Sequence, residues 1–134
     1  MDDELYTAEV LDEVDSPYHR GQLPNPTISH EMDARPNCSD TVRMDLLLNA
    51  ERRVTEAWFS GEGCVFSQAA ASMLTREIEG KPLDELRNLE PAQVLDLLGV
   101  RLTPARQKCA LLCFKVLKTM IYTLDARGGE TNPT

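Results

Sequence analysis

The feature that most constrains the fold is a change in hydrophobic period at two glycines, Gly61 and Gly63. Before them, between residues 28 and 48, apolar and polar side chains mostly alternate, as they do in strands. After them the apolar residues recur every three or four positions, as on one face of a helix. Because glycine relaxes the steric limits on the backbone, the pair permits a tight turn directly before Cys64. The sequence therefore predicts strands first, helices afterwards, and Cys64 at the turn that opens the first long helix.

Three extended segments are expected before this turn, at residues 28–34, 41–48 and 54–60. Consecutive strands that are joined by short turns pair as an antiparallel meander. An acidic amphipathic helix is expected within residues 1–15, and a connector rich in proline follows it. Strands that precede a run of helices indicate an α+β fold. We expect a three-stranded antiparallel sheet that is followed by several helices and packed against them.

The expected helices lie at residues 65–79, 83–89 and 91–98, with a last helix that starts near Pro104. Thr103 is the expected N-cap of this last helix, since threonine caps well and proline suits the first turn. We assign residues 1–127 to a single domain and residues 128–134 to a disordered tail. The apolar stripe of the last helix consists of Cys109, Leu112, Cys113, Val116, Met120 and Leu124.

The charge balance argues against two classes of partner. A net charge of −8 is unsuited to a phosphate backbone, which is bound through clustered lysine and arginine. No apolar run approaches the ~20 residues of a membrane span, and the acidic start is unlike a secretory signal. We therefore expect a cytoplasmic protein with neither nucleic-acid nor membrane partners. In that compartment four cysteines indicate metal binding or thiol chemistry rather than disulfides.

Three cysteines and one aspartate are the candidate chemical groups. Cys38 and Asp40 flank Ser39 just before the second expected strand, and residues two apart in an extended segment point the same way. In an antiparallel meander this loop and the loop with Cys64 lie at the same end of the sheet. Cys109 reaches that end if the last helix packs with its N-terminus toward it. Three thiolates and one carboxylate suit zinc or an iron–sulfur cluster.

The cysteines also have less specific interpretations. Scattered cysteines are often small buried hydrophobic residues, and Cys113, one helical turn after Cys109, is expected in the core. A thiol enzyme would instead pair Cys64 with one of the two histidines, His19 or His30. At the start of a helix, Cys64 is expected to have a lowered thiol pKa.

Two further predictions concern charged residues. Asp45 and the acidic residues within 1–15 are expected on solvated faces. Lys108 either offsets the negative charge of a thiolate site beside it or is an ordinary surface lysine.

The ordered cysteine motifs resemble the IscU/SufU/NifU-N family of iron–sulfur cluster scaffolds, over about residues 4–125. Residues 61–75 (GEGCVFSQAAASMLT) resemble the second cysteine region of that family. Residues 104–112 (PARQKCALL) resemble its third cysteine region, and residues 37–40 (NCSD) resemble its first. The turn at residues 79–82 (EGKP) matches the glycine–lysine turn of the family, and Ser16-Pro17 with Gly21 is similar to its N-terminal Asn-Pro-Arg-Asn-x-Gly stretch.

The resemblance implies a metal or cluster site built from Cys38, Asp40, Cys64 and Cys109. It implies a protein that accepts sulfur from a cysteine desulfurase on one of the three cysteines, assembles a [2Fe–2S] cluster and transfers it to apo iron–sulfur proteins. Such a scaffold is not an enzyme in the usual sense. The alternative is a zinc-binding protein of the SufU type, with zinc-dependent sulfur transfer, or a degenerate paralogue that only binds partners.

The chain departs from the family pattern at several positions. Ser39 replaces the usual glycine between Cys38 and Asp40, and Ser16-Pro17-Tyr18-His19 replaces Asn-Pro-Arg-Asn. Lys108 stands where IscU-type scaffolds carry histidine, which resembles the SufU type. The insertion typical of SufU between the second and third cysteine regions is absent. The sequence thus combines features of both types.

Overall fold

The computed structural model describes residues 8–34 and 39–130 of the 134-residue chain. Its sheet consists of β1 (Ile28–Asp33), β2 (Thr41–Leu48) and β3 (Val54–Glu62), in the order β1-β2-β3. Both pairs are antiparallel, and β2 pairs Thr41 with Glu62 and Leu46 with Ala57. The predicted meander is confirmed, although β3 runs two residues further than the pattern indicated.

Six helices accompany the sheet in the described part of the chain, and together they confirm the α+β class. None of the described helices is long and apolar enough to cross a membrane. Only the second half of the helix expected within residues 1–15 falls in the described region. The helices are α2 (Ala8–Asp15), α3 (Val65–Ile78), α4 (Leu83–Arg87), α5 (Pro91–Leu98), α6 (Pro104–Ala110) and α7 (Leu112–Glu130).

The last helix differs from its prediction in two ways. It is broken at Leu111, whose backbone leaves the helical region (φ −87°, ψ 4°), so that α6 and α7 are separate helices. α7 also continues to Glu130, three residues past the predicted domain boundary. Residues 131–134 lie outside the described residues, so the disordered tail stays a prediction.

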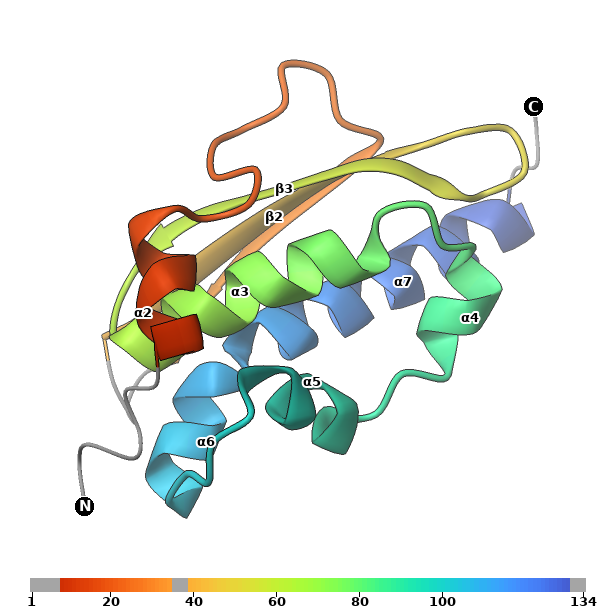
Figure 1. Cartoon of the computed structure of the whole chain (residues 1–134). Coiled ribbons are helices and arrows are strands. Elements are labelled where there is room, and N and C mark those ends of the chain that lie inside the picture. The colour runs from red at the N-terminus through yellow and green to blue at the C-terminus, as the bar shows by residue number, and fades with distance from the viewer. Residues whose placement is uncertain (1–7, 35–38, 131–134) are drawn as a thin grey trace.

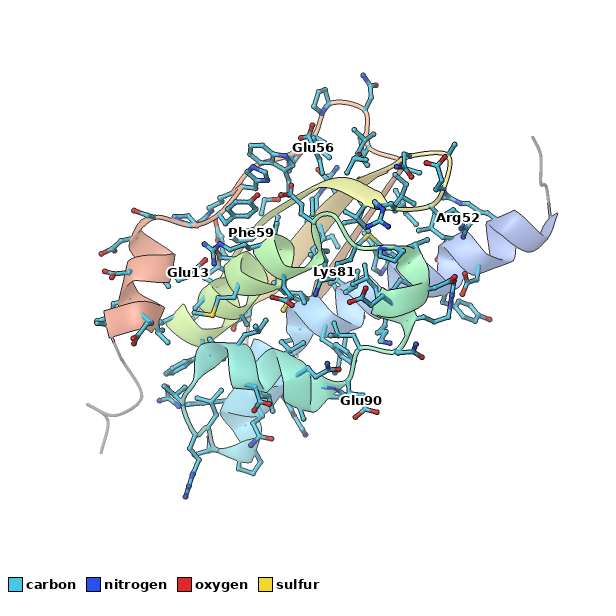
Figure 2. The ribbon with its side chains drawn as sticks, turned by 45° about the vertical axis from the view of Figure 1, so that its right-hand side comes forward. Glu13, Arg52, Glu56, Phe59, Lys81 and Glu90 are labelled. Carbon is cyan, nitrogen blue, oxygen red and sulfur yellow. The ribbon has the colours of Figure 1, made fainter. Side chains whose placement is uncertain are left out.

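The helices α3 and α7 cover one face of the sheet, and α4, α5 and α6 lie beyond them (Figure 1). Helix α3 is the centre of the core, because its alanines Ala69, Ala70 and Ala71 are fully buried and let neighbouring elements approach closely. The core face of β2 contributes Val42, Met44 and Leu46. At the end of the sheet where β2 turns into β3, Arg52 donates to the Leu124 carbonyl of α7 (Figure 2).

The prediction that Asp45 lies on a solvated face is wrong. Asp45 points away from the core, but the connector between α2 and β1 covers that face, and the residue is 1% exposed. Its carboxylate accepts hydrogen bonds of 2.9 Å from the Leu23 amide and from Arg43 Nε. Glu13 of α2 is likewise bound by Ser72 and Arg76.

An aromatic stack holds the connector on the sheet. The ring of His19 lies between those of Tyr18 and Trp58, with centroids 4.0 and 4.4 Å away. His19 Nδ1 is also 2.9 Å from the carboxylate of Glu79, which follows α3. Through these contacts His19 helps to hold the connector on the sheet.

Replacing Asp45 with alanine should lower the free energy of unfolding by about 2 kcal/mol, because the Leu23 amide and the Arg43 guanidinium lose a buried acceptor. Urea unfolding followed by circular dichroism measures the change. The exposed Asp96 supplies the control, and Asp96→Ala should shift the free energy by less than about 0.5 kcal/mol. Equal effects of the two substitutions would contradict the buried role of Asp45.

Candidate metal centre

The two loops that carry the predicted ligands meet at one end of the sheet. Thr41, the first residue of β2, pairs with Glu62, the last residue of β3. Asp40 directly precedes this pair, and Gly63 and Cys64 directly follow it. The antiparallel order therefore brings Asp40 next to Cys64, as the sequence predicted.

Asp40 and Cys64 are joined by a hydrogen bond. The Cys64 amide donates to Asp40 Oδ1 across 3.1 Å. Asp40 is 5% exposed, and its second oxygen, Oδ2, has no hydrogen-bond partner in the described part of the chain. One oxygen thus fixes the carboxylate, and the other remains available to a ligand.

Both glycines before Cys64 are required by the close approach of the two loops. Gly61 and Gly63 have φ values of 140° and 152°, which residues with a side chain rarely adopt. A Cβ atom on Gly63 would overlap the Asp40 carboxyl group, and one on Gly61 would overlap the Thr41 carbonyl group. The glycines therefore determine how near Asp40 lies to Cys64.

Cys64 is the N-cap of α3, which confirms its predicted place. Its Sγ accepts a hydrogen bond of 3.5 Å from the Ser67 amide. The expected lowering of its pKa is wrong, however. Desolvation of the sulfur, and then the neighbouring Asp40 carboxylate, raise the pKa of the Cys64 thiol, and the Ser67 N–H offsets this only in part. Neither His19 nor His30 is among the groups that shift this pKa, so the structure gives no support to a Cys–His pair.

Cys109 lies on α6, which packs against α3. The predicted N-cap of α6 is confirmed, because Thr103 Oγ1 accepts from the Arg106 amide at 3.3 Å. The Arg106 guanidinium carbon lies 5.2 Å from the centre of the ring of Phe66, the second residue of α3. Cys109 follows Arg106 by about one helical turn and is 8% exposed.

Cys113 belongs to the core, as predicted. It is fully buried, its Sγ donates to the Ala110 carbonyl, and burial raises the pKa of its thiol to about 12. Lys108, by contrast, is exposed in the last turn of α6.

The structure thus joins Asp40 and Cys64 and places Cys109 on an adjacent helix. Within residues 8–34 and 39–130, no three histidine, cysteine or acidic side chains are close enough together to hold a metal ion. Cys38 lies outside the described residues. The four-residue ligand set therefore stays a prediction.

The sequence did not indicate two polar residues in the first turn of α3 as neighbours of the site. Ser67 and Gln68 are buried, and the Ser67 hydroxyl and both amide atoms of Gln68 lack hydrogen-bond partners among the described residues. Their spacing of three and four residues from Cys64 was the available signal.

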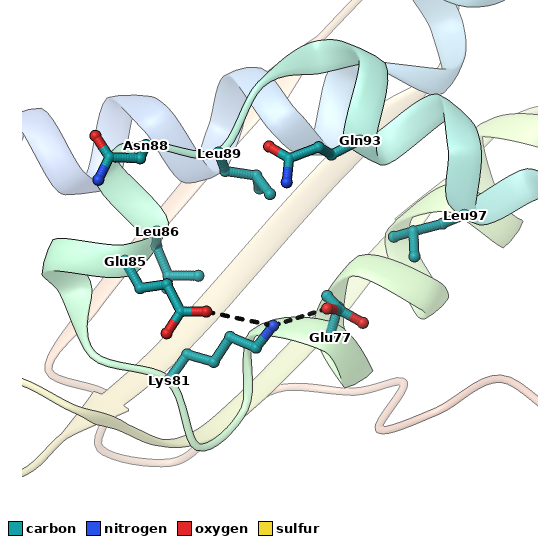
Figure 3. A pocket seen from close by; sticks show the side chains of 8 residues that line it. All are labelled: Glu77, Lys81, Glu85, Leu86, Asn88, Leu89, Gln93 and Leu97. Carbon is teal, nitrogen blue, oxygen red and sulfur yellow. Dashed lines mark hydrogen bonds and ion pairs between the residues drawn. The ribbon is translucent and has the colours of Figure 1, made fainter.

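A separate cleft of about 240 Å³ lies between the C-terminal end of α3 and the helices α4 and α5 (Figure 3). Lys81 lies between two carboxylates there, 2.7 Å from Glu77 and 3.7 Å from Glu85. Since Cys64 caps the opposite end of α3, this cleft is distinct from the candidate centre.

In the metal-free protein, Cys64 should react with iodoacetamide at pH 7 more slowly than an unstructured cysteine peptide. A raised pKa leaves less thiolate at neutral pH and moves the rate–pH profile to higher pH. Asp40→Asn removes a negative charge that raises this pKa, so its profile should move back to lower pH. Mass spectrometry of the Cys64 peptide measures the rates.

Glu62→Gln is the matched control for that experiment. Glu62 is an exposed acid two residues before Cys64 and is not among the groups that shift its pKa. Its profile should coincide with that of the unmodified chain. A profile that Asp40→Asn leaves unmoved would contradict the role given to Asp40.

Comparisons with known proteins agree with the resemblance of the motifs. Residues 5–131 match the model of the family described as "NifU-like N terminal domain". The zinc-dependent sulfurtransferase SufU of Bacillus subtilis is 35% identical over 133 residues, which cover 87% of this chain and 88% of that protein. The iron–sulfur cluster assembly scaffold protein IscU of Azotobacter vinelandii is 25% identical, over 92% of this chain and 97% of that protein.

Solved structures show the same fold. The N-terminal part of a NifU-like protein from Brucella abortus superposes with a TM-score of 0.76, at 22% identity, over 93% of this chain and 97% of that one. The match of the family model to almost the whole chain and the identity to SufU lead to one conclusion. The chain belongs to the NifU-like N-terminal domain family of iron–sulfur cluster assembly scaffold proteins.

Proposed function

We propose that this protein is a sulfur acceptor in iron–sulfur cluster assembly, with a metal site made of Cys38, Asp40, Cys64 and Cys109. The observation that supports this most is the pairing of Asp40 with Cys64. A buried carboxylate is bound through one oxygen, and its other oxygen, beside a thiol, has no hydrogen-bond partner among the residues that the structure describes. An unpaired buried carboxylate oxygen is costly unless a cation neutralises it.

Zinc is the ion that this donor set favours. Zinc is commonly bound by cysteine sulfur together with a carboxylate oxygen, in tetrahedral sites. The name of the 35%-identical SufU relative, a zinc-dependent sulfurtransferase, supports the same choice. When bound, zinc would supply the positive charge that keeps thiolates deprotonated at neutral pH, against the partial desolvation of the Cys64 sulfur and the charge of Asp40.

Sulfur acceptance requires a thiol that a partner protein can reach. Of the described cysteines, Cys64 is exposed, whereas Cys109 and Cys113 are buried. A thiolate attacks the outer sulfur of a persulfide on a cysteine desulfurase. A new S–S bond forms on the acceptor, the S–S bond of the donor breaks, and the donor cysteine leaves as a thiolate, with no net oxidation. We place this exchange on Cys64 or Cys38.

A second candidate is a scaffold that assembles a [2Fe–2S] cluster as cargo and passes it to apo iron–sulfur proteins. The IscU relatives support it, since the alignment covers 97% of the length of the Azotobacter vinelandii protein. The short separation of Cys64 and Cys109, without a SufU-type insertion, also favours it. The two candidates share the same four residues and the same sulfur donor.

Zinc-loaded protein that is incubated with a cysteine desulfurase and cysteine should gain one sulfur atom, because its accessible site thiol accepts persulfide sulfur. Mass spectrometry of the intact protein and of its peptides measures the gain and its position. Cys38→Ser or Cys64→Ser should abolish most of it. Cys113→Ser, a change in a core cysteine of the next helix, is the control and should leave it intact.

The same mixture, supplied anaerobically with ferrous iron, separates the two candidates. An absorption spectrum of a [2Fe–2S] cluster on this protein would favour the scaffold. No added sulfur on the unmodified chain beside an active desulfurase, or sulfur found on Cys113, would refute the proposed function.

A further inference from the structure

The first turn of α3 contains buried polar groups that nothing in the described fold satisfies. Ser67 is 1% exposed and Gln68 is 7% exposed. The Ser67 hydroxyl and both the oxygen and the nitrogen of the Gln68 amide lack hydrogen-bond partners in residues 8–34 and 39–130. Buried polar side chains are nearly always hydrogen-bonded, and those that are not destabilise the fold. These two residues therefore require an explanation.

The rest of the same helix shows the ordinary situation. Further along α3, the buried Thr75 hydroxyl donates to the Ala71 carbonyl at 2.7 Å, and the buried Ser72 hydroxyl donates to Glu13 at 2.5 Å. The unpaired groups are thus confined to the turn behind Cys64. This position links them to the candidate centre rather than to the core in general.

Helix geometry tilts both side chains toward the N-terminal end of α3, which Cys64 caps. Helical side chains lean toward the N-terminus, and Ser67 and Gln68 lie in the first turn of α3, directly after Cys64. Cys64 is held at this end by two backbone donors, because the Ser67 amide donates to Cys64 Sγ and the Gln68 amide donates to the Cys64 carbonyl. The unpaired Asp40 Oδ2 adjoins the same residue. Three buried polar side chains that have atoms without partners among the described residues therefore belong either to the first turn after Cys64 or to its hydrogen-bond partner Asp40.

We propose that Ser67 and Gln68 are positioning residues of the metal site, whose hydroxyl and amide groups donate hydrogen bonds to the Cys64 thiolate when the ion is bound. The inference rests on the proposed function, because it needs the ion to hold that thiolate. A serine hydroxyl and a glutamine Nε2 are both donors, whereas a neutral thiol requires none. Residues that orient metal ligands in this way typically change metal affinity by 10–100-fold when they are replaced.

When Gln68 is replaced, the stability of the metal-free protein and its affinity for zinc should change in opposite directions. In the metal-free protein the Gln68 amide has no hydrogen-bond partner within residues 8–34 and 39–130, so replacing it with an apolar side chain of similar shape should stabilise the fold. In the zinc-loaded protein the amide is paired, so the same change should weaken metal binding. Replacing a residue that has a purely structural role would not both raise the stability of the fold and lower its affinity for zinc.

Gln68→Met is the most direct test. Zinc affinity is measured by competition with a chelator, and metal-free stability by thermal unfolding. We expect zinc to bind about tenfold more weakly and the unfolding midpoint of the metal-free protein to rise by about 3 °C. Ser67→Ala removes only one hydroxyl and should weaken zinc binding in the same direction, which keeps the test available if Gln68→Met fails to fold.

The control is Thr75→Val, which removes a buried hydroxyl that has a partner. It should lower the unfolding midpoint and leave zinc affinity unchanged. Cobalt in place of zinc supplies a spectroscopic measurement, since Gln68→Met and Ser67→Ala should shift the sulfur-to-cobalt absorption bands and Thr75→Val should not.

Two results would overturn the inference, and only the second would also contradict the proposed zinc site. If the unmodified chain binds zinc and both Gln68→Met and Ser67→Ala bind it equally tightly, with unshifted cobalt bands, the two residues serve only the fold or an internal water. The proposed function would then stand. If the unmodified chain binds no zinc, the zinc site and this inference fail together.

Discussion

The hydrogen bond from the Cys64 amide to Asp40 Oδ1 is the contact on which the candidate centre depends. It joins the start of β2 to the first turn of α3, two segments that the hairpin already brings to one end of the sheet. The bond forms because Gly63 has no side chain to collide with the Asp40 carboxyl group. It also determines which oxygen is used and which remains free. A thiol, a half-paired carboxylate and a helix N-terminus are thereby combined at a single position.

This arrangement costs stability in the metal-free protein. Asp40 Oδ2, the Ser67 hydroxyl and the Gln68 amide are all buried without partners in the described structure, and partial desolvation of the sulfur together with Asp40 raises the pKa of the Cys64 thiol. The surrounding fold offsets these costs by enclosing α3 among the sheet and the other helices, with its central alanines fully buried. A cation at the centre would reverse the two terms that involve charge, because it favours the Cys64 thiolate and the Asp40 carboxylate. In the proposed function, the unpaired polar groups of the metal-free site and its affinity for an ion would thus have the same origin.

The sequence predicted what depends on local pattern. The alternation in residues 28–48 and the change of period at Gly61 are sufficient for the meander, and antiparallel order places Asp40 beside Cys64. Side chains and dihedral preferences likewise suffice for the caps at Cys64 and Thr103. Three features were wrong or missed because they depend on distant segments. Asp45 is buried by a connector some twenty residues away in the chain. The pKa of Cys64 follows from partial desolvation of its sulfur and from Asp40 rather than from its helix alone. Gln68 is an ordinary polar residue in the sequence and becomes buried only because other elements enclose α3.

The central claim is that the Asp40 carboxylate and the Cys64 sulfur bind the same ion. X-ray absorption at the zinc edge of the zinc-loaded protein is the sharpest test, because sulfur and oxygen ligands lie at different distances from the zinc ion. Three sulfurs at about 2.3 Å and one oxygen at about 2.0–2.2 Å are expected. Asp40→Ala should alter the oxygen shell, and Cys64→Ser should remove one sulfur. A shell of four sulfurs, or a zinc environment that neither substitution changes, would contradict the claim.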